Sequence, residues 1–364
     1  MPFVPEWAPN VHPLIIHFPI ALLFTAALFD TIGMILKKLP FWKNAATVLY
    51  ISGTLAAVLA LLTGEAAGDS VFLPTAANAL LTEHSDLAHY VVYFFGAFSV
   101  LRITFFLLKL EDKMMFRSIL YIIGLGGLVL LWSTADHGAR MVFEYGVGVQ
   151  AVDNTGVHVP AVSDSTQSSA PAHNSEGGLT WKPTRASAWH DAVTFYGDES
   201  GFMSSMRDGA ERGDVLALSA QGNPIMFTFD RPMTTMQLDG ALNLDDFEGT
   251  VMFVHHVIDN NNYHFTSISK IAMKQGRSEN GDLYLMDDKP YAPTGWSSYR
   301  VVADQTHFRA YADQKLIVHG HGDDPGSGKV GLRLNGKGTV LLDFVQTVSL
   351  RGEGMGETAM EMDH

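Results

Sequence analysis

The sequence predicts a multidomain membrane protein in which a four-transmembrane-helix bundle is followed by an all-β antiparallel sandwich. Three observations support this fold class: four apolar runs in the first 150 residues, an alternation of period two from about residue 189, and a small, polar segment between the two regions. Only 17% of the 364 residues are charged. A soluble domain usually carries about 25%, so part of the chain is expected to lie in lipid.

The four apolar runs are the expected transmembrane helices. They cover residues 14–36, 45–63, 87–108 and 118–135, and their lengths suit the hydrocarbon core of a bilayer. Backbone groups in lipid must be hydrogen-bonded internally, which favours helices. The N-terminal residues lack the basic segment of a cleavable signal, so the first helix is expected to stay as an anchor.

Basic residues predict the orientation of the helices, because cytoplasmic loops are enriched in Lys and Arg. The loops after the first and third runs contain Lys37, Lys38, Lys43, Lys109, Lys113 and Arg117. The segment between the second and third runs is acidic and contains no Lys or Arg. We therefore predict a multi-pass protein of the bacterial inner membrane whose N-terminus and C-terminal domain lie in the periplasm.

Five histidines are expected near the outer membrane surface. His12 and His17 begin the first helix, His84 and His89 begin the third, and His137 ends the fourth. Imidazole ligates haem iron, copper and the magnesium of chlorophyll-type pigments. The predicted ligands of haem b or such a pigment are His17, His84 and His137, with His12 and His89 less favoured; a quinone headgroup is another option. Alternatively, these polar side chains simply collect at helix ends, where water is available.

Two charges lie deeper in the apolar runs. Asp30 and Arg102 each follow an outer histidine of their own helix by 18 residues, so they should reach a similar depth near the cytoplasmic side. An unpaired charge in lipid is costly, which predicts an Asp30–Arg102 ion pair with a structural role. The alternative is that each side chain extends separately to the interface.

The N-terminal region resembles the DUF2231 family of small four-helix bacterial membrane proteins. The resemblance rests on His12-Pro13, His17-Phe18-Pro19, His84 before the third helix and the closing Tyr145-Gly146-Val147-Gly148-Val149, and it covers about residues 10–150. The sequence departs from the family pattern just after His137. The resemblance implies the four-helix topology and an energy-converting membrane more than it implies a reaction.

Residues 151–188 read as a flexible linker, and residues 189–351 as a β-sandwich. Strands are predicted at 215–219, 225–229, 250–254, 263–268, 298–302, 308–312, 314–318, 330–334 and 340–345, separated by turn signals such as Asn280-Gly281 and Asn335-Gly336. The order around Gly328–Leu332, ending in Asp343–Val345, resembles that of laminin-G or concanavalin-type jelly rolls, and this resemblance covers about residues 195–350. Residues 352–364 form an acidic, Met-rich tail that alone is expected to be disordered.

No catalytic constellation is visible in the sandwich, so it is predicted to be a non-catalytic interaction module. The acidic cluster Asp245, Asp246 and Glu248 is expected in a solvated turn rather than as a glycosidase pair. His319 and His321 alternate and could bind a metal, but the Pro325–Gly328 segment that follows favours a loop, so no metal is predicted. His255 and His256 are adjacent, which predicts opposite faces of a strand and no joint role.

The composition of the chain excludes several classes of function. The absence of cysteine excludes disulfides, iron–sulfur clusters and cysteine zinc sites. The net charge of −14 argues against nucleic acid, which needs a basic patch. The leading hypothesis is an accessory subunit of a respiratory or photosynthetic membrane complex, with the lipid bilayer and other membrane subunits as partners. The alternatives are a haem b electron-transfer protein and, ranked last because carbohydrate is not an expected partner, a tethered carbohydrate sensor using aromatics such as Trp296.

Overall fold

The computed structural model describes residues 10–36, 39–149, 167–168, 170–171, 178–186 and 189–351. The chain divides into two compact units, one helical and one a β-sandwich. The sandwich unit also includes the short segment Phe72–Ala79. The predicted acidic tail, residues 352–364, lies outside the described residues.

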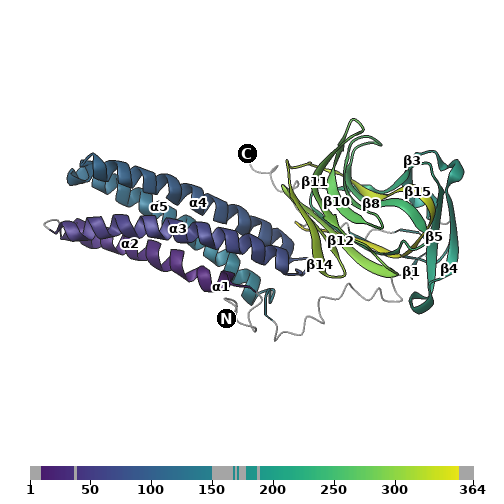
Figure 1. Ribbon diagram of the computed structural model, residues 1–364, viewed down its shortest axis with the longest axis horizontal. Helices are drawn as coiled ribbons and strands as arrows, with labels where there is room; N and C mark the ends of the chain where they lie inside the picture. The colour runs from purple at the N-terminus through teal and green to yellow at the C-terminus, as the bar shows by residue number, and fades with distance from the viewer. Residues whose placement is uncertain are drawn as a thin grey trace, which may run out of the picture. The chain divides into compact units, whose positions relative to one another are not determined.

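The helical unit contains four helices long and apolar enough to cross a membrane, side by side in Figure 1. The helices are α1 His12–Ile15, α2 His17–Ile35, α3 Pro40–Ser70, α4 Ala77–Leu107 and α5 Met114–Phe143, with a 3₁₀ turn, η1 Leu110–Asp112, before α5. α1 and α2 form one span. The last three helices are nine to twelve residues longer than predicted, because hydropathy detects the apolar middle of a helix and not its polar ends.

Aromatic and small side chains form the interior of the bundle. Tyr50, Phe95 and Phe98 are buried and pack ring against ring. A Cβ added at Gly53 would meet the side chain of Leu23 at 2.7 Å. This close approach agrees with the role of small residues in helix packing within membranes.

The second unit is built from strands that pair antiparallel, except that the two-residue β1 pairs parallel with β2. The strands are β1 Gln167–Ser168, β2 Leu179–Pro183, β3 Val193–Gly197, β4 Met203–Asp208, β5 Asp214–Gln221, β6 Ile225–Met233, β7 Met236–Asn243, β8 Phe247–Val257, β9 Tyr263–Ile268, β10 Ala272–Glu279, β11 Asp282–Pro290, β12 Trp296–Asp304, β13 His307–Ala312, β14 Lys315–His321 and β15 Gly328–Ser349. Three 3₁₀ turns, η4 His190–Ala192, η5 Glu199–Gly201 and η6 Ala210–Arg212, join the early strands. The predicted antiparallel sandwich is confirmed.

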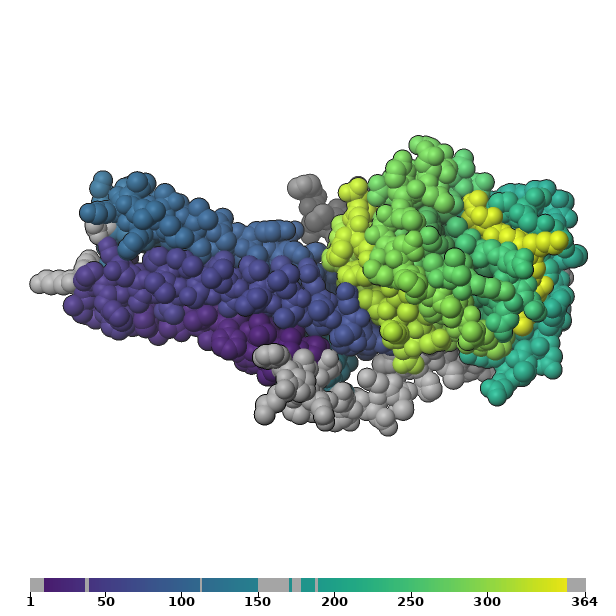
Figure 2. Space-filling view, viewed as in Figure 1, coloured from purple at the N-terminus to yellow at the C-terminus, as the bar shows by residue number. Residues whose placement is uncertain are grey.

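The long strand β15 joins the two layers of the sandwich. The strand order is β11-β10-β9-β8-β15-β7-β12-β13-β14. The first half of β15 pairs with β8 and β6, and its second half pairs with β7 and β5. Figure 2 shows this yellow strand running between the teal early strands and the green later ones. Each half of β15 therefore belongs to a different layer, which gives a jelly-roll-like, nearly closed sandwich.

Glycine permits the bend in β15. Gly338 has a φ of 119°, and a Cβ there would lie 2.1 Å from the carbonyl oxygen of Asp246. The predicted turn at Asn335-Gly336 is therefore wrong, because the chain bends and continues in strand conformation. The predicted turn at Asn280-Gly281 is present between β10 and β11, with positive φ at both residues.

The sandwich begins earlier than predicted. Strand β2 falls inside the expected linker, yet it pairs with the end of β15 and buries Leu179 and Trp181 completely. Trp189 packs beside Trp181 in the same core. Strand β2 therefore closes the core with large apolar side chains, which short-range composition did not reveal.

Candidate metal centre

Two adjacent strands bring three histidines together on one face of the sandwich. Strands β13 and β14 form a hairpin whose two loop residues, Asp313 and Gln314, both have positive φ, as a type I′ turn requires. His307 pairs directly with His321, and Arg309 pairs with His319. Side chains of paired residues and of alternate residues in a strand share a face, so all three imidazoles project from the same side.

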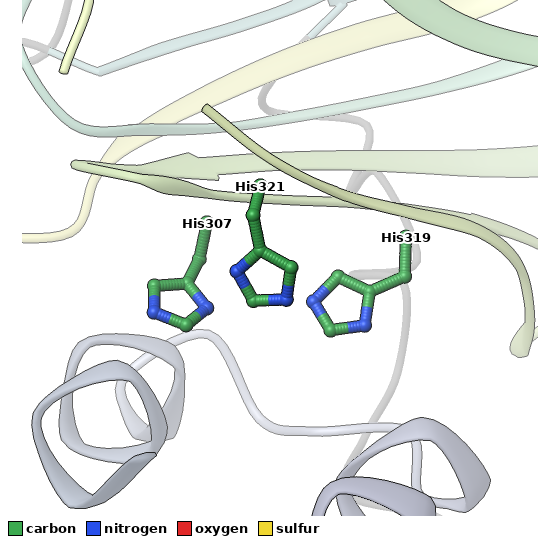
Figure 3. A group of neighbouring side chains, drawn as sticks. All are labelled: His307, His319 and His321. Carbon is green, nitrogen blue, oxygen red and sulfur yellow. The ribbon is translucent and has the colours of Figure 1, made fainter. Parts of the chain in front are cut away.

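The three imidazoles converge closely enough to hold one metal ion. Each of His307, His319 and His321 offers a nitrogen, and these atoms all lie within 4.8 Å of one another. Figure 3 shows the three rings side by side on the same side of the strands, with His321 between His307 and His319. Zinc–nitrogen bonds of 2.0–2.1 Å place neighbouring ligands roughly 3.3 Å apart in a tetrahedron. Small rotations of the side chains would complete that geometry. In the part of the chain that the structure describes, no other group of three His, Cys, Asp or Glu residues meets this criterion.

Accessibility differs across the group. His307 is only 3% exposed, His319 is partly buried, and His321 is exposed. A tetrahedral ion bound by three histidines keeps one position for water or another ligand. The exposure of His321 indicates that this position is open to an approaching ligand.

A carboxylate supports the strand that carries two of the histidines. The backbone N–H of His319 donates to Asp287 Oδ2 on β11 at 3.0 Å, and Lys289 lies 3.1 Å from Asp287 Oδ1. Burial favours the neutral acid, but these hydrogen bonds outweigh it and hold the pKa of Asp287 below its ordinary value. The ionised carboxylate thus fixes β14 at the position of its inner histidine.

The prediction of a loop at His319 and His321 is wrong, because β14 continues through His321 before the glycine-rich segment begins. The third histidine was missed altogether. His307 pairs with His321 only because one residue is inserted in β14 between the partners of Ala310 and Tyr311. A simple two-residue hairpin would pair His307 with Gly320 and turn its ring to the other face.

A second correction concerns His255 and His256, which were predicted on opposite faces of a strand. Their Nδ1 atoms lie 2.7 Å apart. A β-bulge opposite β15 and a φ of +50° at His256 turn both rings to one side. Because His256 Nε2 donates to the carbonyl of Thr234, its Nδ1 accepts, and His255 Nδ1 is the donor in the neutral pair. The two rings therefore act as one hydrogen-bonded unit.

Of the outer histidines of the bundle, three lie close together, but His17 is not among them. His17 is exposed on α2. His12 approaches α3, with Nδ1 3.3 Å from the Thr63 hydroxyl. His84 donates from Nδ1 to the carbonyl of Thr134 at 2.9 Å and has His12 and His137 as electrostatic neighbours.

Acidic side chains accompany the remaining bundle histidines. His137 Nε2 lies 3.4 Å from Glu83, and His89 Nε2 lies 3.3 Å from Glu65. In both contacts the carboxylate lies beside Nε2, the nitrogen through which a histidine would ligate haem iron. The haem and pigment hypotheses stay predictions. The histidine that lies near His84 is His12 and not His17, which had been predicted there.

The predicted ion pair between Asp30 and Arg102 is present. Arg102 donates from both terminal nitrogens to Asp30, at 2.6 and 3.1 Å, and from Nε and Nη2 to the Thr47 hydroxyl. Its guanidinium lies 4.7 Å from the centre of the Tyr50 ring. The arginine thereby links α2, α3 and α4 in the interior of the bundle.

Residues 8–151 match the family model described as "Predicted membrane protein (DUF2231)". This region is a DUF2231 domain. The match confirms the predicted resemblance and the four-helix membrane region, and it places the DUF2231 helices in contact with the lipid bilayer. The three histidines on β13 and β14 lie beyond the DUF2231 domain, so the candidate metal centre belongs to the appended sandwich. No curated protein matches the chain in sequence.

Solved structures similar to the sandwich include two from Bacillus subtilis. One is the carbohydrate-binding module CBM66, with 15% identity over 41% of this chain and 96% of that chain and a TM-score of 0.35. The other is a protein of unknown function with a galectin-like fold, with 11% identity over 46% of this chain and 93% of that chain and a TM-score of 0.37. At TM-scores this low, the similarity does not identify a ligand of this protein.

Proposed function

We propose that this protein is a membrane-anchored metal-binding protein, in which the DUF2231 domain is the anchor and the sandwich holds one transition-metal ion through His307, His319 and His321. The observation that carries the proposal is the convergence of three imidazole nitrogens within 4.8 Å on two hydrogen-bonded strands. Such a set costs little to organise, because the β-ladder already places all three side chains.

The donor set limits the metal. Neutral imidazole suits zinc, copper and nickel, whereas calcium and magnesium prefer oxygen ligands. The three histidines carry no negative charge of their own, so they would bind a dication without neutralising it. The proposed role is metal binding rather than catalysis, in line with the absence of a visible catalytic constellation in the sequence. The periplasmic location of the sandwich, expected from the basic loops, would expose the site to metal from outside the cell.

The test is metal binding by the full-length chain in mild detergent, stripped with chelator and titrated with zinc or copper(II) by calorimetry. The wild-type protein is expected to bind one equivalent. The triple variant H307A/H319A/H321A is expected to lose on the order of 100-fold or more in affinity, since it loses the whole ligand set.

A matched control is H17A, which removes an exposed imidazole outside the sandwich. It should bind metal as the wild type does. Equal binding by the wild type and the triple variant would exclude the proposed site, and so would binding that H17A abolishes. An oxidised and reduced absorption spectrum of the same sample tests the haem hypothesis independently.

A further inference from the structure

A fourth side chain, that of Arg309, lies on the same face as the three histidines. On β13, Arg309 follows His307 by two residues, and it pairs directly with His319 on β14. Residues two apart in a strand share a face, and so do residues paired across two strands. The hairpin therefore carries two neighbouring pairs on this face, His307 with His321 and Arg309 with His319.

Arg309 is buried without the partner that the other buried arginines have. Only 3% of Arg309 is exposed, and its Nη1 atom is buried with no hydrogen-bond partner among the described residues. Arg102 and Arg300 are buried to a similar degree. Each of them donates to a buried carboxylate, that of Asp30 and that of Asp239 respectively.

This difference matters because a guanidinium does not lose its charge in a protein. A buried donor that makes no hydrogen bond costs free energy, and the cost is larger for a charged group. The unused Nη1 of Arg309 therefore indicates an acceptor that the described residues do not supply.

Two carboxylates of the sandwich lie next to this hairpin, but each already has a cationic partner. Arg351 donates to both oxygens of Asp304, at 2.9 and 3.3 Å. Lys289 lies 3.1 Å from Asp287 Oδ1. Neither carboxylate is left to neutralise Arg309.

The charge of the metal centre strengthens this argument. Three neutral imidazoles leave the two charges of a bound dication in place, and the guanidinium adds a third positive charge on the same face. Like charges repel strongly where water is partly excluded. An anion at the open position of the metal would be attracted by both the metal and Arg309, whereas a water molecule would neutralise neither.

We propose that the open position of the metal centre takes a small oxyanion, a carboxylate or a phosphate, with one oxygen on the metal and another accepting a hydrogen bond from Arg309. This inference rests on the proposed function, because it names the class of ligand that the same site binds. Both anions spread their charge over two or more oxygens, which suits the forked donors of arginine. The exposed His321 lies on the side from which such an ion can enter.

The experiment uses the full-length protein in mild detergent, loaded with one equivalent of copper(II), whose visible absorption responds to a change of ligand. Acetate and inorganic phosphate are titrated separately at pH 7, with the ionic strength held constant by perchlorate. The variants are R309M, which removes the charge, and R309K, which keeps the charge but not the fork. The matched control is K315M, which removes an exposed cation from the turn end of the same hairpin.

The wild type, R309M, R309K and K315M are each expected to bind one equivalent of copper(II), which also shows that the hairpin is folded. The absorption of the wild type should change and saturate with at least one anion, and the tighter of the two identifies the ligand as carboxylate or phosphate. R309M should bind that anion about tenfold or more weakly, since it loses a charge-assisted hydrogen bond. R309K should lie between the two, and K315M should match the wild type.

Several results would overturn the inference. These are an absorption spectrum of the wild type that neither anion changes, an equal anion affinity in R309M, and a loss in K315M as large as that in R309M. Calorimetry on the metal-free wild type gives a further test, because an anion bound there as tightly would not be a ligand of the metal. If R309M fails to bind copper(II), R309K decides: weaker anion binding with copper retained supports the inference, and unchanged anion binding overturns it.

The copper stoichiometry separates this inference from the proposed function. If the stripped wild type takes up no copper(II) or zinc, the proposed function fails and the inference falls with it. If one equivalent binds through the histidines but the anions act equally on the wild type and R309M, the proposed function stands and only this inference falls.

Discussion

At the scale of single residues, Arg102 organises the polar interior of the membrane domain. Two carboxylates face it, but unequally: Asp30 accepts two hydrogen bonds, whereas Glu111 lies 4.0 Å from Nη2. Burial raises the pKa of Glu111, although the charges of Arg102 and Lys43 oppose it. Glu111 is therefore the weaker of the two carboxylate partners, and Asp30 is the one that balances the arginine.

Two conservative substitutions test this difference. Asp30→Asn leaves a buried guanidinium without its anion, which should cost about 3–5 kcal/mol of unfolding free energy. Glu111→Gln removes a carboxylate that lies 4.0 Å from Arg102 Nη2, and it should cost no more than about 1 kcal/mol. Both are measured by denaturation in mixed detergent, followed by tryptophan fluorescence. If Glu111→Gln lost more unfolding free energy than Asp30→Asn, the main partner of Arg102 would be Glu111 and the prediction would be wrong.

The histidines within the sandwich predict a dependence of stability on pH. Burial, reinforced by nearby His256 and Arg277, lowers the pKa of His264 from 6.5 to about 4, and burial lowers that of His255 well below its ordinary value. The unfolded chain therefore binds protons between pH 6.5 and 4 that the folded chain refuses. Stability should fall as the pH decreases through this window.

The variant H264Q removes one of these groups. Between pH 7.5 and 4.5, the wild type should lose about 2–3 kcal/mol more unfolding free energy than H264Q, as the size of the pKa shift requires. Chemical denaturation at the two pH values measures it. H17Q, which removes an exposed histidine, should keep the full pH dependence of the wild type. Identical pH profiles for H264Q and the wild type would show that His264 is not buried in its neutral form.

At the scale of elements, β-bulges decide which side chains meet. One extra residue in β14 turns His307 to the face of His319 and His321. Another irregularity, opposite β15, brings the rings of His255 and His256 together. A bulge changes the side-chain alternation by one residue, so it moves every later residue to the other face.

Gly328 makes the second bulge possible. A Cβ at this position would lie 2.5 Å from the Cα of His256 and 2.4 Å from its carbonyl carbon. Backbone atoms yield little, so Gly328→Ala should cost about 2–4 kcal/mol of unfolding free energy and separate the two rings. Thermal denaturation measures the loss. The matched control is Gly126→Ala, where a Cβ meets nothing within 4 Å and helix propensity favours alanine; a similar loss there would contradict the steric explanation.

These bulges also mark the limit of prediction from the sequence. Long apolar runs predict the helices, and alternation predicts β9 at Tyr263–Ile268 with its observed ends. Alternation also places His319 and His321 on one face. The partner strand, its register and the inserted residue are set by contacts across the sheet, which a local pattern does not contain. His307 could therefore not be joined to the other two from the sequence alone.

At the scale of the whole molecule, the apolar runs and the later strand-like alternation predict two regions, and these regions also differ in net charge. Residues 1–150 carry a net charge of −2, and the remaining −12 lies in the later residues. The observed units follow this division closely, except that Phe72–Ala79 belongs with the sandwich. Within that unit, Arg300 donates to the carbonyl of Leu73 and lies over the Phe72 ring. These contacts explain why Phe72–Ala79 groups with the sandwich, although the segment lies within the helical region of the sequence.

The orientation in the membrane is the prediction on which access to metal depends. The chain has no cysteine, so each introduced thiol is unique. Ser327→Cys lies in an exposed loop of the sandwich, and Lys113→Cys lies exposed between α4 and α5. If Lys-rich loops face the cytoplasm, a membrane-impermeant maleimide applied to spheroplasts should label S327C at once and K113C only after the membrane is permeabilised. The reverse pattern would place the three histidines in the cytoplasm, where metal would have to reach them from inside the cell.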